Sequence, residues 1–310
     1  MHYQLERHFS SFDEFNSFPH GWDTDFSTTS AAPCSVTLRQ CAVPGMMINT
    51  ARLGAATLQQ ASTPVGMRTF ALPMRLSAPY CWRGLPINET TLMTFPLDRE
   101  LFSVMGADSE VLTMSIEQDL VDRYLHNLDL DPEAIFRRPH TADLAGRQYA
   151  TLLGKIDLMT NFMARYGDHA QFPELSRGIQ EFLFESMLAP LVAHLDQPHT
   201  RRSNATRRVK MAADFILARL DQAITVEEVC NHVGCSRRSL EQGFRQHAGT
   251  SPKQFIQVMR LKQCRKALLT APPKSQVNRI ANQHGFWHLG QFAAAYRKLF
   301  GETPRQTLRT

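Results

Sequence analysis

The sequence predicts an α+β protein in which a β-rich N-terminal domain precedes a helical segment and an all-α C-terminal domain. Three observations carry this prediction. Short apolar runs broken by proline and glycine fill the first 120 or so residues, a helical pattern follows, and a duplicated helix-turn-helix pattern occupies the last third. With 310 residues the chain is long enough for two domains.

The N-terminal part contains short β-type runs at regular intervals. Residues 34–43, 46–53, 67–74 and 91–97 combine apolar and β-branched side chains and are separated by turn-forming residues. Such spacing is typical of an antiparallel β-barrel or sandwich. We therefore expect a β-rich domain over residues 1–128.

Helical patterns follow at residues 110–128 and roughly 131–195. Asp131-Pro132-Glu133 has the form of an N-cap followed by proline in the first helical turn. Pro190 is expected to kink the later part of this segment. We take 129–196 as a helical segment.

A polar stretch then separates the two halves of the chain. Residues 197–206 are rich in Arg, Ser, Asn and Thr and are predicted to be a linker. The C-terminal domain is expected over residues 207–310.

Charge is distributed very unevenly along the chain. The whole sequence has a net charge of +5, but residues 201–310 carry 20 Lys and Arg against 6 Asp and Glu, a net charge of +14. Residues 1–200 carry a net charge of −9. A basic module of this kind attracts polyanions through counterion release, so nucleic acid is the expected partner. Uneven charge that serves only solubility is the simpler alternative.

The basic third contains an internal duplication. Residues 229–252 and 280–304 share small, glycine, large, large, glycine and proline positions in the same order, at offsets of 51 and then 52. The matched pairs are Cys230/Ala281, Gly234/Gly285, Leu240/Phe292, Phe244/Tyr296, Gly249/Gly301 and Pro252/Pro304. Each copy therefore predicts a helix, a short turn and a second helix.

The first copy shows how each unit is built. Thr225 and Glu228 have the spacing of a capping box, and Gly234 suits a left-handed turn after the first helix. Ser236 is predicted to cap the second helix, whose Leu240 and Phe244 face the core. One long helix over 252–269 joins the copies, and this helix would hold the two second helices about 34 Å apart, one DNA turn.

These residues resemble a known family. The sequence from Gly285 to Pro304, G-F-x-H-x-x-x-F-x-x-x-Y-R-K-x-F-G-E-T-P, and V-G-C-S-R-R-S-L-E-Q-G-F-R at 233–245 are similar to the AraC/XylS-type DNA-binding domain. The resemblance covers about a third of the chain. It implies a double helix-turn-helix regulator of transcription, usually an activator that contacts RNA polymerase. Gly290 departs from the family, where serine is common, and weakens the expected DNA contact at that turn.

The outward faces of the two recognition helices supply candidate DNA contacts. Side chains with hydrogen-bonding ends are expected to reach base edges, and basic side chains nearby are expected to bind phosphates. The candidates are Ser236, Arg237, Arg238, Gln242, Arg245, Lys253, His288, Gln291, Arg297 and Lys298.

The N-terminal half is similar only in outline to the cupin-like sensor domain of these regulators. That similarity implies a small-molecule effector of unknown identity, and a homodimer formed through residues 129–196. No motif identifies the effector. Candidate effector-binding residues are Trp22, Arg39, Arg68, Tyr80 and Trp82, aromatic or cationic side chains that would also be ordinary as core or surface residues.

Two other classes of protein were weighed against a specific regulator. The first is an enzyme, such as a metal cupin or a repair activity, that carries a DNA-binding appendage. The histidines lack metal-ligand spacing, and Cys34 and Cys41 are expected to be buried thiols rather than a redox pair, so no catalytic residue, metal or cofactor is predicted. The second is a nonspecific nucleic-acid binder. Apolar runs are too short for a membrane helix, and a cytoplasmic protein with reduced cysteines is expected.

Overall fold

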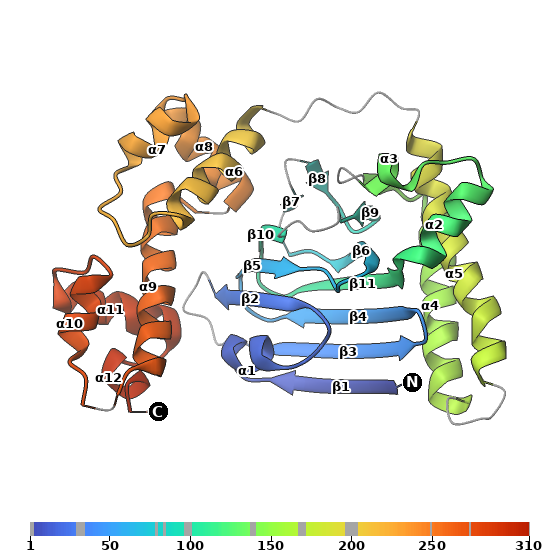
Figure 1. The fold of residues 1–310 in the computed structure, drawn as a ribbon, viewed down its shortest axis with the longest axis horizontal. Helices are drawn as coiled ribbons and strands as arrows, with labels where there is room; N and C mark the ends of the chain where they lie inside the picture. The colour runs from blue at the N-terminus through green and yellow to red at the C-terminus, as the bar shows by residue number, and fades with distance from the viewer. Residues whose placement is uncertain are drawn as a thin grey trace.

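The computed structural model describes most of the chain. Described are residues 3–28, 35–77, 80–82, 85–95, 101–136, 141–166, 172–195, 204–248, 250–272 and 274–309. In Figure 1 a central β-region separates a group of helices that follows it in the chain from the C-terminal helices on its other side.

The large central sheet has seven strands in the order β1-β3-β4-β11-β6-β9-β12. All pairings in it are antiparallel. Its strands are β1 (Tyr3–Phe9), β3 (Val36–Val43), β4 (Met46–Leu53), β11 (Ser109–Glu117), β6 (Met67–Arg75), β9 (Thr91–Thr94) and β12 (Thr141–Asp143).

Two smaller sheets complete the β-region. A three-stranded sheet has the order β10-β5-β2, and β7 pairs with β8. The bounds are β2 (Asp23–Thr28), β5 (Thr57–Ser62), β7 (Tyr80–Trp82), β8 (Leu85–Ile87) and β10 (Leu101–Met105). The pairings among described residues leave these sheets open, so the expected β-rich domain is present but closure into a barrel is not confirmed.

Both faces of the large sheet are buried, because its strands alternate between two apolar environments. In β11, Leu112 and Met114 belong to the core shared with the following helices, whereas Val111 and Thr113 face a cavity on the opposite side. A sheet that is covered on both faces needs nearly continuous apolar strands. This explains why the prediction of a helix from residue 110 is wrong: β11 runs to Glu117, and α2 begins only at Gln118.

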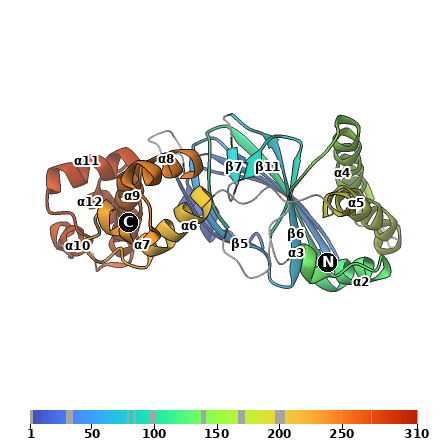
Figure 2. The same ribbon diagram turned by 90° about the horizontal axis from the view of Figure 1, so that it is seen from above.

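Helices cover the face of the sheet that lies away from the C-terminal half (Figure 2). Their apolar side chains form one core with β3, β4, β6 and β11. Pro190 lies inside helix α5. The bounds in the N-terminal half are α1 (Phe12–Ser17), α2 (Gln118–Asn127), α3 (Pro132–Phe136), α4 (Gly146–Tyr166) and α5 (Phe172–Leu195).

The C-terminal half is helical throughout. Its helices are α6 (Asn204–Leu217), α7 (Val226–Val233), α8 (Arg237–Ala248), α9 (Pro252–Thr270), α10 (Val277–Gln283), α11 (Leu289–Phe300) and α12 (Pro304–Thr307). One core gathers side chains of α6, α7, α8 and the start of α9, and a second gathers the end of α9 with α10, α11 and α12. Helix α9 therefore links two helix-turn-helix units, as the duplication predicts.

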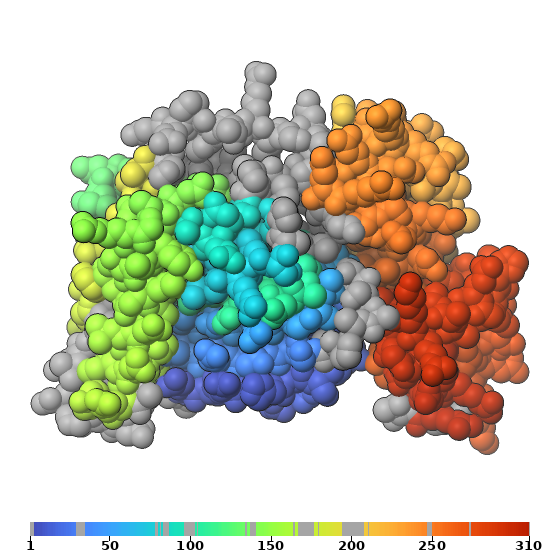
Figure 3. All heavy atoms as spheres, turned by 180° about the vertical axis from the view of Figure 1, so that it is seen from behind, coloured from blue at the N-terminus to red at the C-terminus, as the bar shows by residue number. Residues whose placement is uncertain are grey.

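Residues 197–203 of the predicted linker lie outside the described part of the chain. Helix α6 begins at Asn204, so the end of the predicted linker is helical. Figure 3 shows the three parts from behind, with α4 beside the sheet and the C-terminal helices on the opposite flank. Among the described residues, no helix is long and apolar enough to cross a membrane.

Candidate nucleic-acid interface and interior cavity

The first helix-turn-helix unit is fixed by local hydrogen bonds. The Thr225 side chain accepts from the Glu228 backbone N–H at 3.2 Å, and the Thr225 backbone N–H donates to the Glu228 carboxylate at 2.7 Å. Gly234 has φ of 62°, a left-handed conformation that costs glycine little. The Ser236 hydroxyl accepts from the Ser239 backbone N–H at 3.2 Å and starts α8. The predicted capping box, turn and cap are all confirmed.

Helix α8 turns its apolar stripe inward. Leu240 and Phe244 are buried, and the Phe244 ring packs edge-on against Phe255 of α9 at 5.5 Å between centroids. Arg238, Gln242 and Arg245 are exposed and recur at intervals of four and three residues, so they lie along one side of the helix. Polar groups on such a stripe are what a helix needs to read bases in a major groove.

Arg237 is exposed but already has partners. Its guanidinium lies 3.1 Å from Glu241 and 3.8 Å from Glu227. These carboxylates hold Arg237 toward α7, whereas Arg238 has no ion pair among the described residues. Of the two neighbouring arginines, only Arg237 is held by carboxylates among the described residues.

The second unit is anchored by a buried tyrosine. Tyr296 of α11 is fully buried, and its hydroxyl donates to the Thr307 side chain of α12 at 2.8 Å. Burial, the largest cause, raises the pKa of Tyr296 to about 12, so this hydroxyl stays protonated. Phe292 and Tyr296 correspond to Leu240 and Phe244 and face the core in the same way.

The outward side of α11 carries the other predicted contacts. His288, Gln291, Arg297 and Lys298 are all exposed. Trp287 is not among the contacts predicted from the sequence; it is 74% exposed and lies two residues before the start of α11. An indole left in solvent beside a recognition helix is unusual for a core residue and is the signal that could have singled it out.

Contacts hold helix α9 at its start and in its second half. Ser251 and Gln254 form a capping box at its start, and Lys253 is exposed in the first turn. Further along, Lys262 and Arg265 turn toward the N-terminal half, with side chains only 14% and 16% exposed.

Two ion pairs join α9 to the N-terminal half. Lys262 lies 3.1 Å from Asp25 of β2, and Arg265 lies 2.6 Å from Asp13 of α1. Arg265 also pairs with Glu302 at 2.6 Å. Burial, the largest cause, lowers the pKa of Lys262, and the nearby Asp25 carboxylate opposes this. The acidic residues of the N-terminal half thus hold two cations of the basic half.

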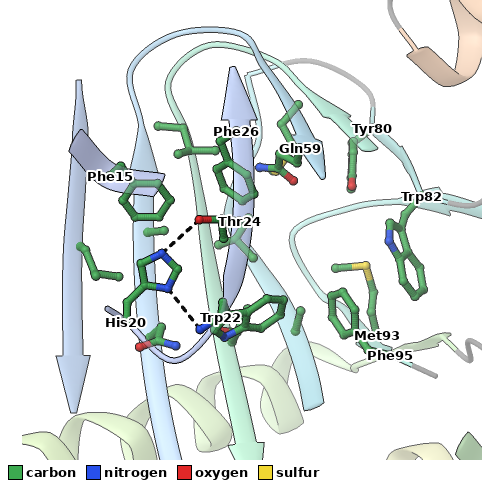
Figure 4. A pocket seen from close by; sticks show the side chains of 18 residues that line it. Phe15, His20, Trp22, Thr24, Phe26, Gln59, Tyr80, Trp82, Met93 and Phe95 are labelled. Carbon is green, nitrogen blue, oxygen red and sulfur yellow. Dashed lines mark hydrogen bonds between the residues drawn. The ribbon is translucent and has the colours of Figure 1, made fainter. Parts of the chain in front are cut away.

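An apolar cavity of about 80 Å³ lies between the large and the three-stranded sheet (Figure 4). Aromatic and aliphatic side chains dominate its lining, and none of the described lining residues is Lys, Arg, Asp or Glu. The lining residues are Phe15, His20, Trp22, Thr24, Phe26, Leu38, Asn49, Ala51, Leu53, Gln59, Ala71, Tyr80, Trp82, Met93, Phe95, Met105, Val111 and Thr113.

His20 is the one imidazole among the described residues of this lining. Its Nδ1 accepts the Trp22 backbone N–H at 3.4 Å, and its Nε2 lies 3.2 Å from the Thr24 hydroxyl. The ring stacks on Phe15 at 4.8 Å. Burial lowers the pKa of His20, so the neutral imidazole is favoured, with its proton on Nε2.

The structure brings together three of the five predicted effector-binding residues. Trp22 lies just before β2, Tyr80 and Trp82 are the two ends of β7, and all three line the cavity. The two arginines lie elsewhere. Arg39 is on the outer part of β3, 3.4 Å from Glu6.

Arg68 is fully buried on the helix-covered side of the large sheet. Its guanidinium lies 3.1 Å from Asp122 of α2 and 3.0 Å from Glu133 of α3, and 4.7 Å from the centroid of the Phe136 ring. These contacts tie β6 to two helices. Arg68 is therefore directed toward these helices and is not among the residues that line the cavity.

Metal and thiol chemistry find little support in the described residues. No group of three or more His, Cys, Asp or Glu is arranged to hold a metal ion there. Cys41, Cys230, Cys235 and Cys264 are free thiols, and burial raises the pKa of Cys41 to about 12. Cys34 lies outside the described residues.

The geometry thus defines a DNA-binding protein with two linked helix-turn-helix units beside a β-rich domain. A family model described as a helix-turn-helix domain matches residues 229–310. The "Probable thc operon regulatory protein" of Rhodococcus erythropolis is 28% identical over 78% of this chain and 70% of its own length. The "XylDLEGF operon transcriptional activator 3" of Pseudomonas putida is 27% identical over 80% of this chain and 75% of its own length.

A solved structure is similar to about a third of the chain. It is that of a probable AraC family transcriptional regulator from Rhodopseudomonas palustris, which is 32% identical over 33% of this chain and 95% of its own length, with a TM-score of 0.32. The present chain is similar to AraC/XylS-type DNA-binding transcriptional regulators. The enzymatic alternative finds no support in these comparisons, whose named relatives are regulators.

Proposed function

We propose that this protein activates transcription at specific promoters in response to a small molecule bound in the apolar cavity. The observation that carries the proposal is the position of the three-stranded sheet. Thr24, Phe26 and Gln59 of this sheet line the cavity, while Asp25 and Leu58 point the other way, toward the C-terminal helices. Because side chains alternate along a strand, the same sheet touches both the cavity and the DNA-binding half.

The DNA-reading surface is proposed from the exposed faces of α8 and α11. Arg238, Gln242, His288 and Gln291 are assigned to base edges, with Ser236 at the start of α8 and Arg237 restrained by its carboxylate partners. Arg245, Lys253, Arg297 and Lys298 are assigned to phosphates. Trp287 joins this surface as an apolar contact for thymine methyl groups or sugars.

Communication between cavity and DNA is assigned to α1 and β2. Phe15 of α1 lines the cavity and Asp13, two residues earlier, pairs with Arg265. Thr24 and Phe26 of β2 line the cavity and Asp25 between them pairs with Lys262. A ligand that moves these two elements changes how α9, and with it both recognition helices, is held. Such a shift requires that the ligand bind the two arrangements with different affinity.

The remaining parts of the regulator are assigned from the family. We place the effector domain at 1–128 with a barrel-like arrangement, the dimerisation segment at 129–196, the linker at 197–206 and the DNA-binding domain at 207–310. A homodimer that contacts RNA polymerase in the cytoplasm is the working assembly. Leu158 and Phe182 of α4 and α5, each about half exposed, support the dimer assignment.

Selection of genomic fragments tests this function. Purified full-length protein, and the double variant Asp13→Asn/Asp25→Asn, would each be incubated with fragments at about 150 mM salt, a physiological ionic strength. We expect enrichment of a few promoters that share two short motifs about one helical turn apart. Flat enrichment with both proteins would overturn the proposal and favour a nonspecific nucleic-acid binder. Enrichment with the double variant alone would show that the free protein is held in an inactive arrangement.

A further inference from the structure

We infer that the cavity takes an uncharged, single-ring aromatic compound that carries one hydrogen-bond acceptor. This inference rests on the proposed function, because it names the chemical class of the effector. It is argued from the charge, size, shape and hydrogen-bonding state of the cavity lining.

The absence of charge in the described lining decides the first property. A carboxylate moved from water into an apolar site loses its hydration, and only a paired cation or several hydrogen-bond donors can compensate. None of the described residues that line the cavity is Lys or Arg, and burial favours the neutral form of His20. The two arginines predicted as effector contacts lie elsewhere, Arg68 beside Asp122 and Arg39 beside Glu6.

The size of the cavity sets an upper limit on the ligand. Its volume is about 80 Å³, whereas an engineered cavity that binds benzene measures about 150 Å³. One ring therefore already requires the lining to move outward, and a larger ligand would require much more. The lining includes α1 and β2, the elements whose acidic residues hold α9, so this movement has a path to the DNA-binding half.

Aromatic side chains form the walls on two sides. Trp22 and Phe95 meet edge-on at 5.7 Å between ring centroids, and Trp82 lies 5.3 Å from Phe95. Figure 4 shows Trp22 between His20 on one side and Met93 and Phe95 on the other, with Tyr80 and Trp82 across the cavity. A flat aromatic ligand can stack on these rings or meet them edge-on. It should therefore bind more tightly than an aliphatic ligand of equal area.

The described lining includes a buried hydrogen-bond donor without a partner. The indole Nε1–H of Trp22 is buried and makes no hydrogen bond within the described residues. Other polar groups are already engaged: the Asn49 side chain accepts from Gln40 at 2.8 Å, and the Gln59 side chain accepts from Ser103 at 2.9 Å. A buried unpaired donor is costly, so a ligand that brings an acceptor to Trp22 gains what the free protein lacks.

Calorimetric titration of the full-length protein at pH 7 without DNA tests the inference. The probes are benzamide, benzoate, toluene and cyclohexanecarboxamide; benzamide and benzoate have nearly the same shape and differ in charge. We expect one molecule of benzamide per chain, at least 100-fold weaker binding of benzoate, and weaker binding of cyclohexanecarboxamide. Benzoate that binds as tightly as benzamide, or no binding of any neutral aromatic probe at millimolar concentration, would overturn the inference.

Two tryptophan variants locate the acceptor contact. Trp22→Phe keeps a ring but removes the N–H, and should weaken benzamide about five-fold while toluene binding is unchanged. Trp287→Phe is the matched control, because Trp287 is exposed in the C-terminal half and should change neither titration. Equal loss of benzamide and toluene in Trp22→Phe would refute the hydrogen bond. Because no DNA is present, failure here is separate from failure of promoter selection.

Discussion

Asp25 and Lys262 lie 237 positions apart in the chain, yet their charged atoms are 3.1 Å apart across the contact between β2 and α9. Asp25 remains largely accessible, whereas the Lys262 side chain is only 14% exposed. The cation is therefore the partner that depends on the pair. On either side of Asp25, Thr24 and Phe26 face the cavity.

The two members of this pair should respond differently to substitution. Asp25→Asn leaves a buried ammonium group without its carboxylate, and we expect a loss of about 1–3 kcal/mol in stability. Lys262→Met removes the buried cation itself and leaves only the accessible Asp25 carboxylate. The stability of this variant should therefore be unchanged or higher. Urea unfolding followed by circular dichroism would compare the two. Equal destabilisation by both variants would mean that the pair contributes packing rather than charge.

Both variants should nevertheless weaken communication. In fluorescence-anisotropy titrations of the selected promoter, wild-type protein should show different affinity with and without benzamide, and this ratio should move toward one in either variant. Lys266→Met is a suitable control, since Lys266 is exposed on the same helix. A ratio that survives in Lys262→Met would exclude this ion pair as the route.

The base-edge and phosphate assignments predict different kinds of DNA-binding defect. Arg238→Ala should cost about 1–3 kcal/mol on the cognate promoter and little on unrelated DNA. Lys253→Ala should weaken both alike and reduce the salt dependence of log K by about one unit. Titrations at several salt concentrations on cognate and scrambled fragments would separate the two. Arg237→Ala should have a smaller effect than Arg238→Ala, because Glu227 and Glu241 already bind Arg237.

The C-terminal half was predictable because its information is local. Capping boxes, the left-handed Gly234 and the i, i+4 stripe of Leu240 and Phe244 are properties of neighbouring residues, and the duplication states them twice. Helix α9 was predicted within a residue or two for the same reason.

The N-terminal half was harder because its sheet is covered on both faces. An apolar run such as 109–117 has no clear alternation when each side meets a core, and only its pairing with β4 and β6 makes it a strand. Contacts between residues far apart in the chain also determine where Arg68 lies. Arg68 looked suited to an anionic ligand, but Asp122 and Glu133, more than fifty residues away in the chain, bind it on the other side of the sheet.

Arg68 is therefore predicted to be structural. Arg68→Met would leave the Asp122 and Glu133 carboxylates without the buried cation that they share. We expect a loss of about 3–5 kcal/mol in stability. The combined variant Arg68→Met/Asp122→Asn should recover part of this loss. The measurement is urea unfolding of each variant. A mild loss of stability together with a selective loss of ligand affinity would instead place Arg68 in ligand binding.

The capping box of α7 gives a prediction about pH. Thr225→Ala should destabilise the protein by about 1 kcal/mol, as for other N-caps. The Thr225 backbone N–H, the largest cause, lowers the pKa of Glu228 below its ordinary 4.5. The stabilisation from ionised Glu228 is present above the unfolded pKa and disappears as pH falls through the folded pKa. Unfolding at pH 7 and pH 3 should show a difference between wild type and Glu228→Ala that shrinks at acid pH. A difference independent of pH would assign the effect to helix propensity.

His20 should make ligand binding sensitive to acid. Burial lowers its pKa from the ordinary 6.5, so the neutral ring contributes stability above that value that is lost as pH falls through the folded pKa. Protonation of His20 would place a positive charge in the apolar cavity. It would also break the hydrogen bond in which Nδ1 accepts the Trp22 backbone N–H. Benzamide affinity should therefore fall between pH 8 and pH 5 in wild type but not in His20→Gln, which cannot titrate in that range. Equal pH dependence in both proteins would mean that the group whose titration affects binding lies outside the cavity.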